Sequence, residues 1–325
     1  MDGTPFPVKQ VTNIYQGNLS YPFNEVQSLR FIAAIRRDGY IVRAQENVAG
    51  SLTEPTRTEN FLNVRGEYVH DNTIAPATNI WKGLRYKAYF ELFNRLGGTF
   101  KGMGREANGD LTFNAGIDAR HYLKIYRNFI WAVRGAADFS WGDNKMIYYV
   151  GGTDGWLMLG NNVVIRNGVP VERYFNTANR PALGVNYVYE TLAPNLRGFT
   201  QNAANGNNNM VINSELRLPV FATLFNKPIN NAFLRNFQLV QFVDLATAWN
   251  GRYNKIGRPE IVYSEPGSPV SVVVKAPGIG PFLGSYGFGA RSTLLGYFIR
   301  FDAGWPMSGF FEGRPKMHVS LGFDF

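Results

Sequence analysis

The sequence predicts an all-β protein, a transmembrane antiparallel β-barrel, and three observations support this fold class. The first is strict alternation at the end of the chain, because successive strand side chains point to opposite faces. One such face would carry Met317, Val319, Leu321, Phe323 and Phe325. The second is composition, with 15% aromatic but only 18% charged residues. The third is the absence of any run of about eighteen apolar residues, so a membrane-spanning chain would need a closed barrel.

Composition also restricts the class of protein. The 325 residues allow one large β domain or two ordinary ones. The chain holds 35 Gly, 17 Tyr and 25 Phe, as expected for many strands joined by glycine-rich turns and rimmed by aromatic girdles. A mean hydropathy of −0.19 is too low for a helical membrane protein. Cysteine is absent, which excludes disulfides and cysteine-based metal sites.

The charge pattern indicates which partners to expect. The formal net charge is +9, and basic residues are scattered singly rather than clustered. Scattered charge of this sign favours contact with anionic lipid head groups, here outer-membrane lipid and lipopolysaccharide. Because no cluster of basic residues occurs, we expect no nucleic-acid partner.

Alternating segments recur along the chain at the spacing of barrel strands. Eleven strands are expected, near residues 8–20, 26–45, 59–71, 82–95, 109–124, 128–141, 209–221, 235–249, 283–294, 296–306 and 316–325. Single-chain bacterial barrels normally have an even number of strands. We therefore expect 11 or 12 strands here, as the C-terminal part of a 16-stranded barrel whose first strands lie outside this chain, or else a miscount.

The two faces of these segments differ in polarity. In chain order, the apolar faces carry Leu29, Phe31 and Ile35; Leu62, Val64 and Tyr68; Leu84, Phe90 and Leu92; Leu111, Phe113 and Ile117; Phe129, Trp131 and Phe139; Ile212, Leu216, Leu218 and Val220; Leu239, Val243 and Leu245; and Tyr297, Ile299, Phe301 and Trp305. The opposite faces carry Arg30 and Arg36; Arg65 and Glu67; Arg85, Lys87 and Glu91; Asp118 and Arg120; Arg134 and Asp138; Glu215 and Arg217; Asp244; and Arg300 and Asp302. A Lys or Arg on the lipid face near mid-membrane would cost ~2–4 kcal/mol, so this separation favours apolar faces turned to lipid. A soluble sandwich also alternates, and strand lengths of about ten residues favour the membrane barrel over it.

Connections between the segments alternate in length. Short ones fall at 21–24, 124–128 and 294–296, and long ones at 46–58, 96–108, 142–208 and 250–282. In outer-membrane barrels the short turns face the periplasm and the long loops face outward. Residues 142–208 are too many for a plain connection, so we expect this loop to be functional.

The N-terminal residues do not resemble a signal peptide. Residues 1–7 read Met-Asp-Gly-Thr-Pro-Phe-Pro and lack a basic region followed by an apolar one. An outer-membrane protein must be exported, so we expect a processed end or a cut inside a longer chain. Residues 1–325 are expected to form one barrel domain.

Several motifs occur in an order that resembles a known family. They are Leu196-Arg197-Gly198-Phe199, Glu215-Leu216-Arg217-Leu218-Pro219, Phe242-Val243-Asp244-Leu245-Ala246, Gly287-Phe288-Gly289-Ala290-Arg291 and Arg300-Phe301-Asp302-Ala303-Gly304-Trp305-Pro306. Together they resemble the barrel of the BamA/TamA-type bacterial surface-antigen superfamily, and the resemblance covers about residues 110–325. The family's Val-Arg-Gly-Phe/Tyr motif lies in its sixth extracellular loop, and its strand motif is Phe-x-Asp-x-Gly. Here Ala246 stands in place of the motif's Gly.

The resemblance implies that the loop 142–208 folds back into the barrel. Its Arg197 would be held by acidic residues of the next two strands, Glu215 and Asp244, an arrangement that we call the loop lock. Arg offers a rigid fork of donors that two carboxylates can satisfy. Gly198 would permit a sharp turn, Phe199 would wedge the loop tip, and Leu196 completes the motif.

The resemblance also implies a function in the bacterial outer membrane, namely insertion, assembly or translocation of other outer-membrane proteins. A weak seam beside the last strand, with Val319, Leu321, Phe323 and Phe325, would template an incoming strand. The family's periplasmic POTRA modules are not visible in this sequence, which leaves open an accessory barrel within a larger envelope complex. Alternation of this kind is also compatible with a passive pore or with a soluble carbohydrate-binding sheet.

No motif of enzyme chemistry is present. The three histidines, His70, His121 and His318, lack metal-ligand spacing, and there is neither a nucleophile elbow nor a phosphate-binding loop. Glu215 and Asp244 could suggest acid–base catalysis, but inward Arg residues make ion pairing the better interpretation. We therefore expect neither an enzyme nor a cofactor or metal.

Overall fold

The computed structural model describes most of the chain. The described residues are 8–42, 57–74, 82–99, 111–166, 168–181, 187–225, 228–252, 260–264, 271–275, 277–294, 296–309, 311 and 313–322. Phe323 and Phe325 of the predicted seam lie outside them, as do most residues of the predicted connections 46–58 and 96–108.

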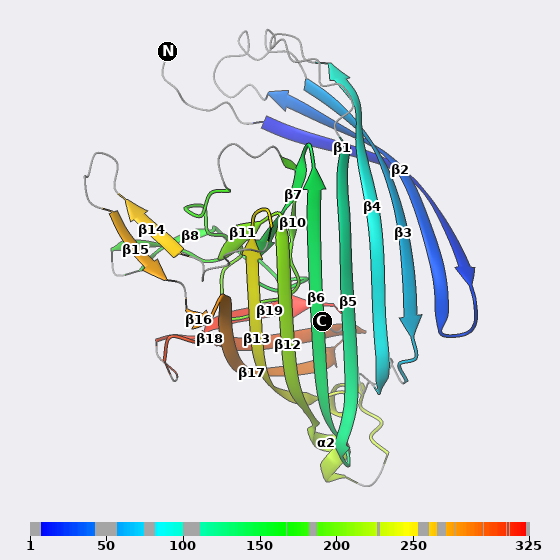
Figure 1. Cartoon of the computed structure of the whole chain (residues 1–325). Coiled ribbons are helices and arrows are strands. Elements are labelled where there is room, and N and C mark those ends of the chain that lie inside the picture. Colours follow the sequence, from blue (N-terminus) through cyan, green and yellow to red (C-terminus); the bar gives the residue numbers. More distant parts are fainter. Residues whose placement is uncertain are drawn as a thin grey trace.

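One large antiparallel sheet forms the wall of the molecule (Figure 1). Its strands, in spatial order, are β1 (Val8–Pro22), β2 (Gln27–Val42), β3 (Arg57–Asp71), β4 (Gly83–Thr99), β5 (Leu111–Tyr126), β6 (Phe129–Gly142), β12 (Asn208–Pro219), β13 (Gln238–Trp249), β17 (Phe282–Leu294), β18 (Tyr297–Pro306) and β19 (Lys316–Leu321). A short strand, β16 (Gly278–Ile279), pairs with β17. The eleven predicted strands are thereby confirmed. Neighbouring strands of the wall are consecutive in the chain except at β6–β12 and β13–β17, where shorter strands intervene.

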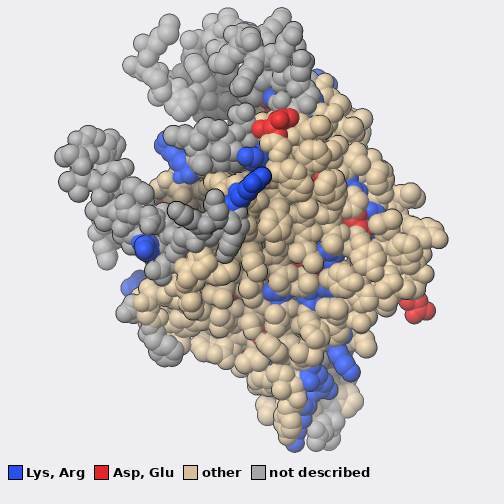
Figure 2. All heavy atoms as spheres, in the orientation of Figure 1, with Lys and Arg blue, Asp and Glu red and all other residues tan. Residues whose placement is uncertain are grey.

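The wall has an apolar face and a polar face, as the alternation predicts. Along β13, Leu239 and Val243 are exposed while Phe242 and Asp244 are buried. Figure 2 shows a mainly uncharged surface, with Lys and Arg gathered at the end that carries helix α2 (Val220–Leu224). Large exposed apolar side chains follow the same parity on the other strands, for example Phe90, Ile117 and Phe301. These exposed apolar side chains are not covered by the rest of the described chain. A face of this kind needs an apolar partner or an apolar solvent.

Several strand ends differ from the prediction. The strand β12 stops at Pro219, so Val220, predicted on the outer face of a strand, begins α2 instead. Proline lacks an N–H and cannot continue the ladder, which ends β12 at that residue. Residues 43–45 of the second predicted strand lie outside the described residues. A second unpredicted helix, α3 (Ala232–Arg235), is capped by Asn231. Its side chain accepts hydrogen bonds from the backbone N–H groups of Phe233 and Leu234.

The long connection between β6 and β12, residues 143–207, forms its own structure, and we call it the insertion. It contains β7 (Lys145–Val150), β8 (Val163–Arg166), β9 (Val169–Glu172), β10 (Tyr187–Leu192) and β11 (Ala204–Gly206). β7 is the centre of a three-stranded sheet between β10 and β11, and β8 pairs with β9. None of these strands was predicted. The connection 250–282 likewise contains an unpredicted hairpin, β14 (Glu260–Ser264) and β15 (Ser271–Lys275).

The insertion packs against the polar face of the wall, and this contact forms the main core. Buried side chains of the insertion, including Tyr148, Val150 and Leu196, cluster with Val211 and Leu283 of the wall. Among the described residues no pairing joins β1 to β19, which are the two ends of the strand order. No helix of the described residues is long and apolar enough to cross a bilayer.

Candidate functional site

The Leu196–Phe199 motif forms a tight turn against the wall. Leu196 is fully buried, and its N–H donates to the carbonyl oxygen of Gly152, 3.0 Å away. Gly198 has φ +82°, a left-handed conformation that favours glycine. Phe199 is half-buried and packs against the main core. The turn therefore presents Arg197 to β12 and β13.

The structure brings Arg197 into contact with both acidic residues that the resemblance paired with it. Its Nε and Nη2 donate to the two carboxylate oxygens of Asp244, each at 2.7 Å. Its Nη1 contacts Glu215 Oε1. The backbone N–H of Arg197 also donates to Asp244, at 3.1 Å. The guanidinium lies 3.7 Å from the ring centroid of Phe242. All three guanidinium nitrogens thus have a carboxylate partner, and the pair with Asp244 is bidentate.

The cluster is larger than the three residues expected. Glu215 also accepts from Arg217 at 2.8 Å and contacts Arg291, and both of these guanidinium groups are buried. Asp302 lies 3.7 Å from Arg197. All of these side chains share the inward parity of β12, β17 and β18, so the signal was present in the alternation. Which of them meet depends on strand register, and this could not be read from the sequence.

Charge compensation favours the charged form of Arg197 in this buried cluster. Burial by itself would lower the pKa of Arg197, but the carboxylates of Asp244 and Glu215 raise it well above its ordinary value. Glu215 and Asp244 are each fully buried. Removing one partner from such a group leaves an uncompensated buried charge, which is strongly destabilising. The cluster therefore joins the turn to β12 and β13 through buried ion pairs.

Backbone contact between the insertion and the wall completes the site. Gly198 lies against Gly304 of β18, where a side chain at residue 304 would place its Cβ 2.6 Å from the nitrogen of Gly198. The N–H of Gly198 donates to Nε2 of His318 on β19, at 3.1 Å. One turn thus contacts β12, β13, β18 and β19. It also lies beside β17, where a Cβ at Gly198 would be 3.1 Å from Ser285 Cβ.

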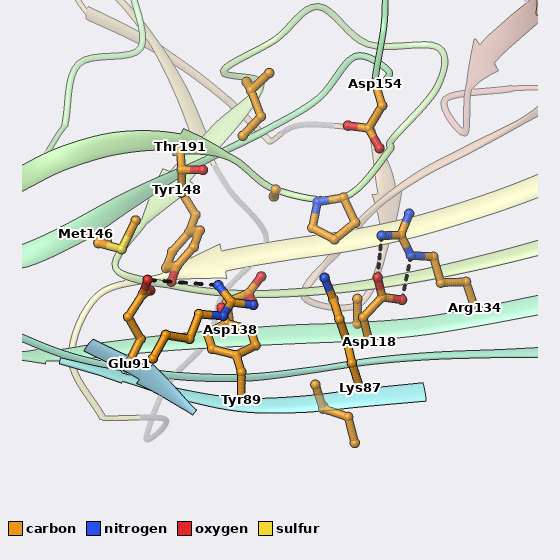
Figure 3. Close-up of a pocket in the computed structure, with 16 residues that line it drawn as sticks. Lys87, Tyr89, Glu91, Asp118, Arg134, Asp138, Met146, Tyr148, Asp154 and Thr191 are labelled. Carbon is orange, nitrogen blue, oxygen red and sulfur yellow. Dashed lines mark hydrogen bonds and ion pairs between the residues drawn. The ribbon is translucent and has the colours of Figure 1, made fainter. Parts of the chain in front are cut away.

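A polar cavity of about 250 Å³ lies between the insertion and strands β3 to β6 (Figure 3). In Figure 3 the side chain of Lys87 points into it, beside the ion pair of Arg134 with Asp118, whose closest N–O distance is 2.9 Å. Tyr148 of β7 lines the same space, where burial and the nearby Asp138 raise its pKa. Acidic and basic groups alternate around the cavity, so its charges largely compensate each other.

The remaining candidate residues are placed as follows. Val319 and Leu321 of the seam lie on the exposed face of β19. His70 stacks on Tyr86, while His318 is buried beside the turn. Among the described residues, no group of three or more His, Asp or Glu side chains is arranged to hold a metal ion.

Comparison with known proteins identifies the fold. Neither a protein-family model nor a curated protein sequence matches this chain. Among solved structures, the chain is similar to BamA from Haemophilus ducreyi lacking POTRA domains 1–3, with a TM-score of 0.52 and 13% identity over 97% of this chain and 55% of that one. CdiB from Acinetobacter baumannii matches with a TM-score of 0.38 and 13% identity, over 96% of this chain and 50% of that one. The wall therefore has the fold of a BamA-type barrel, as the motifs predicted, and spans about half the length of the BamA structure.

Proposed function

We propose that this chain is an integral barrel of the bacterial outer membrane that acts in the insertion, assembly or translocation of other outer-membrane proteins. The observation that carries the proposal is the Arg197 turn, clamped by Glu215 and Asp244 on adjacent strands of a BamA-like sheet. In this proposal the clamp holds a large insertion against the inner face of the wall. The strands β1 and β19 are the two ends of the described strand order. No catalytic residue is needed for such a role.

The apolar outer face supports the membrane location. Exposed apolar side chains such as Phe90, Val243 and Phe301 share one face of the wall, while charged groups share the other. Outer-membrane lipid and lipopolysaccharide are the partners that this face suits, because a transmembrane barrel carries an apolar band on its exterior.

Substitution on that face gives a first test. We expect Val243→Arg to lower the free energy of unfolding from phospholipid vesicles by about 2–4 kcal/mol, because the charge would meet hydrocarbon. The matched control is Ile165→Arg, which places the same charge on an exposed apolar residue of the insertion. Urea titrations of both variants provide the measurement. Equal stability of the two variants would show that this face does not contact lipid.

The ends of the sheet suggest how the activity would operate. An edge strand exposes backbone N–H and C=O groups that can pair with an incoming strand. The N–H of Gly322 donates to Phe298 of β18. Backbone groups alternate in direction along a strand, so the carbonyl oxygen of Val319 and the N–H of Leu321 point away from β18. Unfolded outer-membrane proteins or other envelope proteins are the partners proposed for this edge.

A reconstituted system tests the activity. Purified chain in phospholipid vesicles should accelerate the folding of an unfolded eight-stranded outer-membrane barrel, measured by gel mobility, relative to empty vesicles. Leu321→Pro should slow this folding because it removes a backbone donor at the edge of β19, whereas Leu321→Ala, which keeps the donor, should not. No acceleration by the unmodified chain would reject the insertion role.

An accessory role in a larger envelope complex is the second candidate. The chain spans 55% of the length of the BamA structure, and the insertion occupies the inner face of the wall. An accessory barrel should co-purify from native membranes with stoichiometric partners. Recovery of the chain alone would count against that role.

A further inference from the structure

A short piece of the insertion pairs with the outer edge of β19. The N–H of Leu157 donates to the carbonyl oxygen of Val319 at 2.8 Å, and the N–H of Leu321 donates to the carbonyl oxygen of Gly155 at 3.1 Å. Trp156 and Ser320 stand directly opposite each other as an antiparallel bridge. Gly155–Leu157 therefore occupies the position that the next strand of the wall would take.

The side chains of this segment continue the alternation of β19. Trp156 points to the same side as Ser320 and packs on the buried His318, with 4.3 Å between ring centroids. Leu157 is exposed, as are Val319 and Leu321 of β19. The segment thus places an aromatic ring inside the wall and an apolar side chain outside it, as a wall strand does.

Glycine makes the close pairing possible. Gly155 has φ +63°, and a side chain there would place its Cβ 2.0 Å from the carbonyl oxygen of Leu321. Thr153 Oγ1 lies 2.8 Å from Ser320 Oγ, which adds one side-chain hydrogen bond to the contact. The pairing is nevertheless short, since it involves one opposed residue pair, whereas β18 and β19 form six. A longer strand could therefore form more hydrogen bonds at this edge than the segment does.

We propose that Gly155–Leu157 is a displaceable stand-in strand, which keeps the edge of β19 closed until an extended polypeptide replaces it. This inference rests on the proposed use of that edge by incoming strands, and it adds the step that controls access. The edge accepts a new strand only after the segment leaves, so a chain with the segment fixed in place cannot pair.

A disulfide tests whether the segment must move. The chain has no cysteine, so a Trp156→Cys, Ser320→Cys double variant can form only one disulfide. Opposed residues between the hydrogen bonds of an antiparallel pair lie close together, so the bond should form on mild oxidation. The two single variants, treated in the same way, control for the loss of each side chain. Failure of the double variant to cross-link would overturn the pairing itself.

Strand addition is then measured with a defined probe, a fluorescent peptide with the sequence of residues 316–325. In detergent micelles, the oxidised double variant should bind this peptide at least about tenfold more weakly than its reduced form, because the binding-competent fraction falls. Leu157→Pro removes the donor to Val319 and should strengthen binding several-fold, whereas Leu157→Ala keeps the donor and should bind as the unmodified chain does.

The outcomes separate this inference from the proposed function. Equal peptide binding by the oxidised and reduced forms, or no binding even by Leu157→Pro, would overturn the stand-in strand. Gated peptide binding together with no acceleration of client folding would support the stand-in strand and reject only the insertion role.

Discussion

Replacing Arg197 with alanine is expected to lower the free energy of unfolding by about 3–5 kcal/mol, the usual cost of removing one partner from a buried ion pair. Asp244 would lose the two hydrogen bonds from the Arg197 side chain, and Glu215 would lose one of its cationic partners. Urea unfolding in micelles measures the loss. The turn should also detach from the wall, so that protease cuts residues 187–200 faster.

Two further variants make the Arg197 result specific. Arg180→Ala removes an exposed arginine of the same insertion and should change neither stability nor cleavage. Arg197→Lys keeps the charge but not the planar fork, and should recover only part of the stability. If Arg197→Ala and Arg180→Ala behaved alike, the loop lock would not hold the insertion in place.

Gly304→Ala is expected to destabilise the docked insertion by about 1–3 kcal/mol, the range for overpacking a close contact. The added Cβ would lie 2.6 Å from the nitrogen and 2.8 Å from the Cα of Gly198. Both neighbours are backbone atoms, so no side-chain rotation can relieve the clash. The N–H of Gly198 should then lose His318 as its acceptor, and hydrogen exchange at this amide should accelerate.

Gly135→Ala is the control for that experiment. Gly135 also lies within a wall strand, β6, but a Cβ there would meet no atom within 4 Å. Its alanine variant should retain the protection of the Gly198 amide. Unchanged exchange in Gly304→Ala would show that the close approach of the two glycines does not set the position of the turn.

The strands of the wall could be predicted because their signal is local. Along β13, for example, Leu239 and Val243 meet the exterior and Asp244 meets the interior, as their alternation in the sequence predicted. The order of the strands followed as well, since chain neighbours usually pair in an antiparallel sheet. Arg197, Glu215 and Asp244 were named by the resemblance, and the structure places them in contact, while their role as a loop lock remains a proposal.

The insertion could not be predicted in the same way. Its strands are short, and β7 is buried on both faces, so it shows no alternation. The helix α2 follows from Pro219 only once the end of β12 is known. Arg217, Arg291 and Asp302 belong to the buried cluster because of how the strands are placed beside one another. The cluster joins residues up to 105 positions apart in the sequence, as with Arg197 and Asp302.

The sequence by itself determined an all-β wall with one apolar and one polar face, because a strand records its two environments in every second residue. Only the tertiary structure decided what the polar face holds. Gly155–Leu157 contains no pattern that points to β19, and its pairing with Val319 and Leu321 uses backbone groups that every residue except proline possesses. Which backbone groups meet depends on where the folded chain places them, so the side-chain pattern alone could not predict this contact.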